Sequence, residues 1–151
     1  MEAIFLSSYR FAGWEQATVP VKTNEYPGIA TPRDLYDRLS AGGWSAETCA
    51  PRLREKWSEE NKTCGQCSIT AFLVQDLFGG QVYGVPLPDG NFHCYNVVDG
   101  HTFDLTSEQF RENLDYRDNP EQFRQVHFAK EEKRQRYELL KRRLLALCQG
   151  K

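Results

Sequence analysis

The spacing of apolar residues changes along the chain, and the change separates predicted helices from predicted strands. Over residues 67–78, apolar side chains recur at three and four residues, which is the spacing of a buried helix face. Two glycines follow and end this helix. A threonine–proline start and a glycine pair at the end predict an earlier helix over residues 31–43. Fourfold apolar spacing predicts another over residues 45–60.

Beyond residue 80 the period shortens to the alternation that is typical of strands. Asp99-Gly100 lies between two such stretches and is the kind of dipeptide that favours a two-residue β-hairpin turn. Near the C-terminus a helical seam of leucines returns, flanked by lysines and arginines that we expect to form a solvated face. The predicted strands cover residues 81–87, 92–98 and 101–105.

Helices followed by an antiparallel sheet predict an α+β fold. We expect N-terminal helices and a core helix that starts at a cysteine, packed together on the sheet. A chain of this length forms one domain. The predicted single domain, 1–151, consists of an irregular N-terminal wrap over 1–30, a helical part over 31–80, antiparallel strands over 81–106 and a C-terminal helix over 129–148.

Composition narrows the class of protein. The chain has 151 residues and a formal net charge of −2, so its charge gives no reason to expect a nucleic-acid partner. No apolar stretch approaches the roughly 20 residues of a membrane span, and we expect no membrane association. The five cysteines are odd in number and irregular in spacing, unlike a secreted disulfide framework, which indicates a reducing, cytoplasmic compartment. The oligomeric state is left open.

Cys67 is the leading candidate for chemistry because it stands where a glycine-containing loop turns into a buried helix. Unpaired N–H groups and the helix dipole at such an end stabilise a thiolate and lower its pKa. The same N–H groups can donate to an oxyanion on a substrate carbonyl. Gly65 leaves room for a substrate to approach, and Gln66 adds an amide donor beside the thiol. We therefore predict that Cys67 is a nucleophile.

A nucleophilic thiol needs a base, and the predicted hairpin provides one. Counting outward from the aspartate–glycine turn puts His93 and Asp104 on one face of the sheet, as diagonal neighbours within side-chain reach. A carboxylate in that position orients an imidazole and stabilises its protonated form. His101 falls on the opposite face. The sequence thus predicts a triad of Cys67, His93 and Asp104.

Short motifs occur along the middle and the C-terminal part of the chain, namely Trp57, Asn61, Gly65-Gln66-Cys67, Thr70-Ala71, Val74-Gln75-Asp76, Phe78-Gly79-Gly80, His93, Tyr95-Asn96, Asp99-Gly100, Phe103-Asp104-Leu105-Thr106, Gln109-Phe110 and Arg136-Tyr137-Glu138-Leu139-Leu140. With these motifs the sequence resembles the YunG family of small, uncharacterised bacterial proteins. The resemblance is good over roughly residues 57–110, moderate in the C-terminal helix and hardly present over residues 1–30.

More distantly, a cysteine at a helix start, followed by a histidine and an aspartate on adjacent strands, resembles the papain-like and transglutaminase-like hydrolases. This resemblance implies their architecture and acyl transfer through a thioester, with a small-molecule or peptide amide as substrate and no cofactor. Ser68 stands where the papain loop has an aromatic residue, and Asn61 where it has glutamine. The oxyanion donor is therefore left between Gln66 and Asn61. We also expect Tyr95 and Trp57 to position substrate.

Other interpretations stay open beside the triad, which itself needs no metal. Cys67 can be an inert core residue of a non-catalytic binding module on the same fold. Cys64 and Cys67 can supply half of a zinc site, with His93 and Cys94 as the other half, although adjacent strand residues point to opposite faces. The two cysteines of this CxxC sequence can also form a redox pair.

Overall fold

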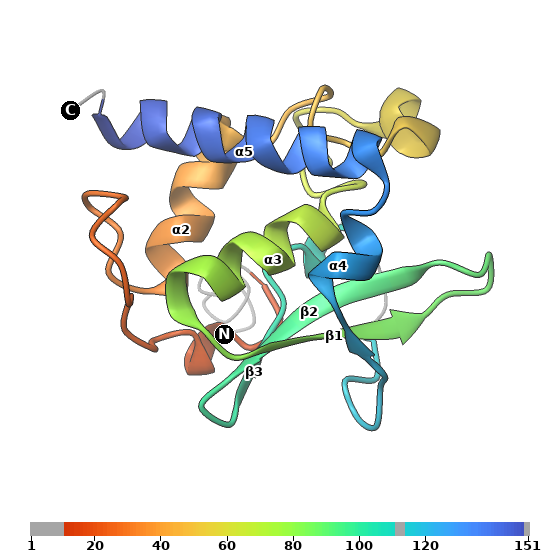
Figure 1. The fold of residues 1–151 in the computed structure, drawn as a ribbon, viewed down its shortest axis with the longest axis horizontal. Coiled ribbons are helices and arrows are strands. Elements are labelled where there is room, and N and C mark those ends of the chain that lie inside the picture. Colours follow the sequence, from red (N-terminus) through yellow and green to blue (C-terminus); the bar gives the residue numbers. More distant parts are fainter. Residues whose placement is uncertain (1–10, 111–113, 150–151) are drawn as a thin grey trace, which may run out of the picture.

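A four-stranded antiparallel sheet lies beneath two layers of helices in the computed structural model, which describes residues 11–110 and 114–149 (Figure 1). The strand order is β3-β2-β1-β4, so the α+β prediction is confirmed. The strands are β1 (Gln81–Pro86), β2 (Phe92–Val98), β3 (His101–Phe103) and β4 (Glu121–Gln122). The helices are α2 (Pro32–Arg38), α3 (Cys67–Phe78), α4 (Arg124–His127) and α5 (Glu131–Gln149), with short turns η1 (Trp14–Gln16), η2 (Leu39–Gly43), η3 (Pro51–Lys56) and η4 (Ser107–Gln109).

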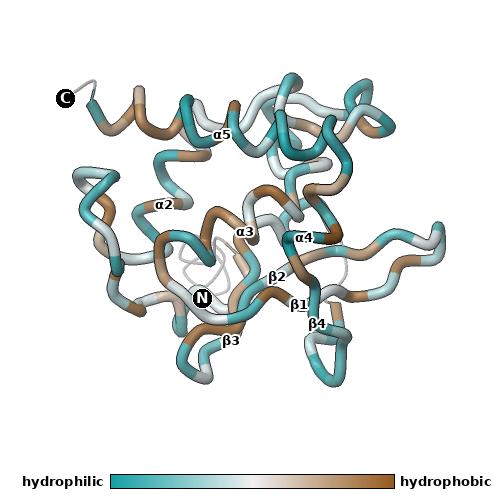
Figure 2. The backbone as a smooth tube through the Cα atoms, in the orientation of Figure 1, coloured by the Kyte–Doolittle hydropathy of each residue, from teal (hydrophilic) through white to brown (hydrophobic). Residues whose placement is uncertain are grey.

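The helix α3 is the centre of the fold and begins at Cys67, as predicted. Nine of its twelve residues are buried, because β2 packs against one side and α5 against another. Figure 1 shows it between the sheet and α5, and Figure 2 shows the apolar character of most of its length. A helix that is apolar nearly all round is stable only inside a fold. Burial of α3 therefore holds its first residue in a defined place against the sheet.

The β2–β3 hairpin has the register that its turn predicts. Asp99 and Gly100 both have positive φ, 52° and 81°, as a type I′ turn requires. Val98 faces His101, and the pairing continues outward in step. The third strand is shorter than predicted, because Asp104 pairs with Ala12 of the N-terminal segment instead of continuing along β2. Residues 1–10 of the predicted N-terminal wrap lie outside the described residues.

The prediction of a helix over residues 45–60 is wrong. Turns and the 3-10 helix η3 occupy this stretch. Ser45 and Thr48 bond each other's backbone through their hydroxyls, an alternative to helical hydrogen bonds that such residues offer. Pro51 lacks the N–H that a continuous helix would need. The sequence also gave no sign of β4 and α4, which are short and lie in a stretch rich in turns.

The helix α5 matches the predicted C-terminal helix and covers α3 and η2. Leu140 and Leu144 of its leucine seam are buried, and two arginines anchor the helix to the rest of the chain. Arg136 donates to the Thr48 carbonyl oxygen at 3.0 Å, and Arg143 donates to the Gly43 carbonyl oxygen at 2.9 Å. Part of the basic surface expected to be solvated is thus used for docking. None of the described helices has the length and apolar character needed to cross a membrane.

Candidate active site

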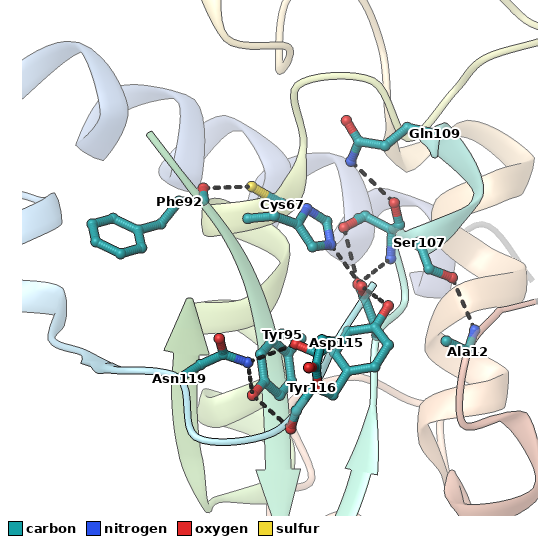
Figure 3. A network of polar contacts seen from close by, with 12 residues as sticks. Ala12, Cys67, Phe92, Tyr95, Ser107, Gln109, Asp115, Tyr116 and Asn119 are labelled. Carbon is teal, nitrogen blue, oxygen red and sulfur yellow. Dashed lines mark hydrogen bonds and ion pairs between the residues drawn. The ribbon is translucent and has the colours of Figure 1, made fainter. Parts of the chain in front are cut away.

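Cys67 lies at the first position of α3, beside the start of β2, and its side chain is partly exposed. Its Sγ atom is 3.7 Å from the carbonyl oxygen of Phe92, to which the protonated thiol can donate (Figure 3). Gln66, which precedes the helix, makes no capping hydrogen bond with its side chain. The first helical bond runs from the Thr70 N–H to the Gln66 carbonyl oxygen, so the N–H groups before it point out of the helix end beside the sulfur.

His93 is held by Asp104, as the hairpin register predicts. The ring is buried, and its Nε2 atom lies 2.6 Å from Asp104 Oδ2. Phe110 packs edge-on against the ring, with 4.6 Å between centroids. The His93 ring and the Cys67 side chain are close enough for each to shift the pKa of the other, and since Nε2 faces the carboxylate, Nδ1 is the nitrogen left for the sulfur. The structure thus brings the three residues of the predicted triad together, with His93 between Cys67 and Asp104.

Asp104 is buried and accepts four hydrogen bonds. Besides the bond with His93, its Oδ2 atom accepts from the Tyr116 hydroxyl at 2.7 Å. Its Oδ1 atom accepts from the N–H and the hydroxyl of Thr106, at 3.1 and 3.3 Å. Four donors around two oxygens fix the carboxylate, and with it the imidazole. The position of Thr106 two residues after an aspartate is a recognisable turn signal, whereas nothing in the sequence points to Tyr116.

Electrostatics favour a thiolate at Cys67 and an imidazolium at His93. A hydrogen bond from the Cys94 thiol lowers the pKa of Cys67 well below its ordinary value; burial opposes this, and His93 lowers the pKa further. Burial of the His93 ring also opposes its charge, but Asp104 and Cys67 outweigh burial and raise its pKa to about 10. Both shifts favour the charged forms near neutral pH, and each charge adds to the stabilisation of the other. An imidazolium beside a thiolate is the resting form of an activated thiol.

Cys94 is a neighbour of Cys67 that strand alternation does not predict. It follows His93 directly in β2, so the two side chains leave the strand on opposite faces. Cys67 nevertheless contacts both, because its sulfur lies close to the strand backbone at Phe92. The Cys67 thiolate raises the pKa of Cys94 well above its ordinary value, which keeps Cys94 protonated as a donor.

Gln66 and Gly65 lie in the loop that leads into α3 and contact neighbouring loop residues. The Gln66 side chain is fully buried, and its amide donates to the Ser45 carbonyl oxygen at 3.0 Å. Gly65 has a φ of 71°, and a Cβ there would lie 2.5 Å from Cys49 Sγ, so its missing side chain makes room for Cys49 and not for a substrate. Both residues shape the loop that leads into α3. The backbone N–H groups at the start of α3 thus remain the donors nearest the Cys67 sulfur in the sequence.

Among the described residues, the others predicted to position substrate form hydrogen bonds with residues around Cys67 and His93 and not with these two residues themselves. Trp57 donates from its indole to the Lys62 carbonyl oxygen at 2.8 Å and braces the loop before α3. Asn61 lies in that loop, bridged to Ser58, and none of the hydrogen bonds found among the described residues joins its amide to Cys67. Tyr95 is buried and donates to the Tyr116 carbonyl oxygen at 3.2 Å, so it supports the segment that holds Asp104 (Figure 3).

The two cysteines of the CxxC sequence, Cys64 and Cys67, have different neighbours. Cys64 is buried and its thiol interacts with Cys49, and burial raises the pKa of both thiols, that of Cys49 to about 11. In the part of the chain that the structure describes, no three or more histidine, cysteine or acidic side chains are grouped so as to hold a metal ion. The four ligands of the alternative zinc interpretation are therefore not assembled. Raised thiol pKa values also disfavour Cys64 as an attacking redox cysteine.

Replacing Cys67 by serine should change how stability depends on pH. In the folded wild type the Cys67–His93 pair holds one proton, on the imidazole. Between the ordinary pKa values of histidine, 6.5, and cysteine, 9.0, the unfolded pair also holds one proton, on the thiol. Because the number of bound protons is the same in both states, the contribution of the Cys67–His93 pair to the free energy of unfolding does not change with pH between 6.5 and 9.0.

In the Cys67→Ser variant, the pKa of His93 is still raised by Asp104, but no thiolate compensates. The stabilisation by the folded imidazolium is then complete below pH 6.5 and is lost as the pH rises toward the folded pKa, by at most about 1.4 kcal/mol per pH unit. Urea unfolding between pH 6.5 and 8.5 should show the variant losing stability relative to the wild type. If the free energy of unfolding changed with pH in the same way in Cys67→Ser and wild type, the Cys67–His93 pair would not be ionised.

The fold and the site together define an α+β protein with a partly exposed cysteine at a helix start, next to a buried histidine–aspartate pair. The chain belongs to the YunG family, whose model, described as "YunG protein", matches residues 31–149. It is similar to the "Uncharacterized protein YunG" of Bacillus subtilis (strain 168), with 43% identity over 65 residues. That match covers 43% of this chain and 56% of the relative, so the chain spans little more than half of its length. No solved structure matches.

Proposed function

We propose that this protein is a cysteine-dependent acyl-transfer enzyme that acts on amide bonds, with Cys67 as nucleophile, His93 as base and acid, and Asp104 as the residue that orients His93. The observation that carries the proposal is the line of contacts from the Cys67 thiol through the His93 ring to Asp104. A helix-start cysteine served by a histidine and an aspartate from a neighbouring hairpin also supports an architecture like that of papain-like and transglutaminase-like hydrolases.

The first half of the reaction forms a thioester. The Cys67 thiolate attacks the carbonyl carbon of the amide, and a C–S bond forms while the carbonyl π electrons move onto oxygen. The N–H groups at the start of α3 donate to this oxyanion. The tetrahedral intermediate then collapses, the C–N bond breaks, and the leaving amine takes the proton of the His93 imidazolium.

The second half releases the acyl group. Water or an amine attacks the thioester carbon, and the neutral His93 ring takes a proton from the attacking group. The C–S bond breaks, so that the thiolate and the imidazolium are restored. Water as acceptor gives hydrolysis, and an amine gives amide exchange. Asp104 stays charged throughout and stabilises the imidazolium each time it forms. The residues present account for every proton without a cofactor.

A reducing compartment suits this chemistry. All five cysteines are free thiols, and the nucleophile is useful only while it is reduced. We therefore place the protein in the cytoplasm as part of the proposal.

An activated ester tests the proposed thioester directly. We expect p-nitrophenyl acetate to transfer one acetyl group to Cys67, seen as a single adduct by intact-mass and peptide mass spectrometry and removed by hydroxylamine. The reason is that an activated ester makes formation of the thioester faster than its hydrolysis. The Cys67→Ala variant should form no adduct, and the Cys64→Ala variant, which removes a buried thiol three residues earlier, should form it normally. Acetylation at another cysteine, or none at all, contradicts the proposal.

A further inference from the structure

Lys133 is a half-buried cation near the proposed site. It lies in the first turn of α5, and its Nζ atom is 2.9 Å from His127 Nδ1. Its neighbours Arg134 and Arg136 pair with glutamates of the same helix, whereas Lys133 joins none of the ion pairs found among the described residues. Burial lowers its pKa, and the thiols of Cys94 and Cys67 act in the opposite direction. An ammonium group in this position has a charge that no carboxylate of the described chain balances.

His127 is arranged to hold the ammonium group. Its Nε2 atom lies 2.9 Å from the Oε1 atom of Gln122, an acceptor, so Nε2 carries the hydrogen. Its Nδ1 atom is therefore free to accept one hydrogen from Lys133. Burial, followed by Lys133, lowers the pKa of His127 to about 4, so the ring is neutral near neutral pH. Two ammonium hydrogens remain for another partner.

The contacts around Gly84 connect the hydrogen-bonded residues Gln122, His127 and Lys133 to the strand that carries Cys94. Gly84 pairs with Cys94 across β1 and β2, and a Cβ on Gly84 would lie 3.0 Å from Gln122 Cδ. Gln122 thus passes over the sheet on the face that carries Cys94, and it leads to His127. The His127 ring also packs on Phe72 of α3, with 5.3 Å between centroids. Figure 1 shows α4 and the start of α5 beside the end of α3 at which Cys67 lies.

The negative charges already at the site have partners of their own. The Cys67 thiolate is compensated by the His93 imidazolium and the Cys94 thiol. Asp104 accepts four hydrogen bonds on the other side of the His93 ring. A charge on Lys133 is therefore available for an anion that comes from outside the chain.

We propose that Lys133, positioned by His127, binds a carboxylate of the substrate, so that the enzyme selects amides that carry a carboxylate close to the scissile bond. This inference rests on the proposed role of Cys67 as nucleophile. Lysine and carboxylate form a charge-assisted hydrogen bond, which gains strength where water is partly excluded. A neutral amide of the same shape would leave the half-buried ammonium without this bond, and that difference is the source of the selectivity.

Two alkylating reagents of nearly the same shape test the inference without a known substrate. Iodoacetate carries a carboxylate where iodoacetamide carries a neutral amide. We expect the ratio of their rates at Cys67, iodoacetate over iodoacetamide, to exceed the same ratio for free N-acetylcysteine. The Lys133→Gln variant should lower the ratio about tenfold, with little change in the iodoacetamide rate. The matched control is Lys130→Gln, which removes an exposed lysine three residues earlier and should change the ratio far less than Lys133→Gln does.

The possible outcomes separate this inference from the proposed function. If Lys133 served only to stabilise the thiolate, Lys133→Gln would slow both reagents equally, and the unchanged ratio would overturn the inference. A wild-type ratio equal to that of N-acetylcysteine would overturn it as well. Added salt provides a measurement on the unaltered protein: screening should lower the ratio at Cys67 more than at N-acetylcysteine. Slow labelling of Cys67 by both reagents would instead overturn the proposed function, and the inference with it.

Discussion

Iodoacetamide supplied in limiting amount at neutral pH should alkylate Cys67 at least about 100-fold faster than any other cysteine of the protein. Cys67 is partly exposed, and Cys94 and His93 lower the pKa of its thiol. Each of the other thiols is buried and has a raised pKa, and these are Cys49, Cys64, Cys94 and Cys148. Peptide mass spectrometry after partial labelling measures how the label is distributed.

The same reaction tests the role of His93. Glutamine at this position can still donate to Asp104 but cannot carry a positive charge. Without the imidazolium, one of the groups that lower the pKa of Cys67 is lost, so His93→Gln should reduce the thiolate fraction and slow the alkylation of Cys67 by about tenfold or more. The control is His101→Gln, which changes an exposed histidine of the same hairpin. Labelling spread over several cysteines, or equal rates in His93→Gln and wild type, would argue against an ion pair.

Asp104→Asn should be the most damaging isosteric change at the site, with an expected loss of about 3 kcal/mol or more in the free energy of unfolding. The carboxylate is 1% exposed and accepts hydrogen bonds from His93, Tyr116 and Thr106. In asparagine an NH2 group replaces one carboxylate oxygen, so it would face the donors that now bond that oxygen. The imidazolium would also lose the charge of Asp104. Urea unfolding at neutral pH measures the loss.

A second readout separates the effect on His93 from the effect on folding. Without the Asp104 charge, the pKa of His93 falls toward its ordinary value, and the pH at which Cys67 becomes reactive rises. The control Asp89→Asn removes an exposed carboxylate paired with Arg52 at the surface, and should leave the stability nearly unchanged. A loss of similar size in both variants, or an unchanged reactivity profile in Asp104→Asn, would contradict the proposed orienting role.

The predictions that the structure confirms depend on neighbours in sequence. The period of apolar residues in α3 extends over three turns, and each turn repeats the same signal. The Asp99-Gly100 turn sets the register of β2 against β3 by local backbone geometry, and that register makes His93 and Asp104 diagonal neighbours. The buried contact between His93 and Asp104 was therefore predictable without knowledge of the rest of the fold.

The wrong prediction and the contacts that no pattern indicated involve hydrogen bonds outside regular helices and strands. Apolar spacing predicts a helix over residues 45–60, but the hydroxyls of Ser45 and Thr48 bond nearby backbone groups and Pro51 lacks the N–H that the helix needs. Gln66 stands beside the nucleophile in sequence, yet its amide reaches Ser45. Tyr116 completes the set of donors to Asp104 from a stretch with no periodic pattern.

The amino-acid sequence by itself determined where the core helix starts, which hairpin faces it and which histidine meets an aspartate, because periodicity and turn geometry act over a few residues. Only the tertiary structure decided what surrounds the Cys67 sulfur. The close approach of α3 to the β2 backbone brings Cys94 to the thiol, and the docking of α4 and α5 brings His127 and Lys133 toward it. These contacts follow from the packing of buried side chains between elements distant in sequence, and no local pattern encodes them.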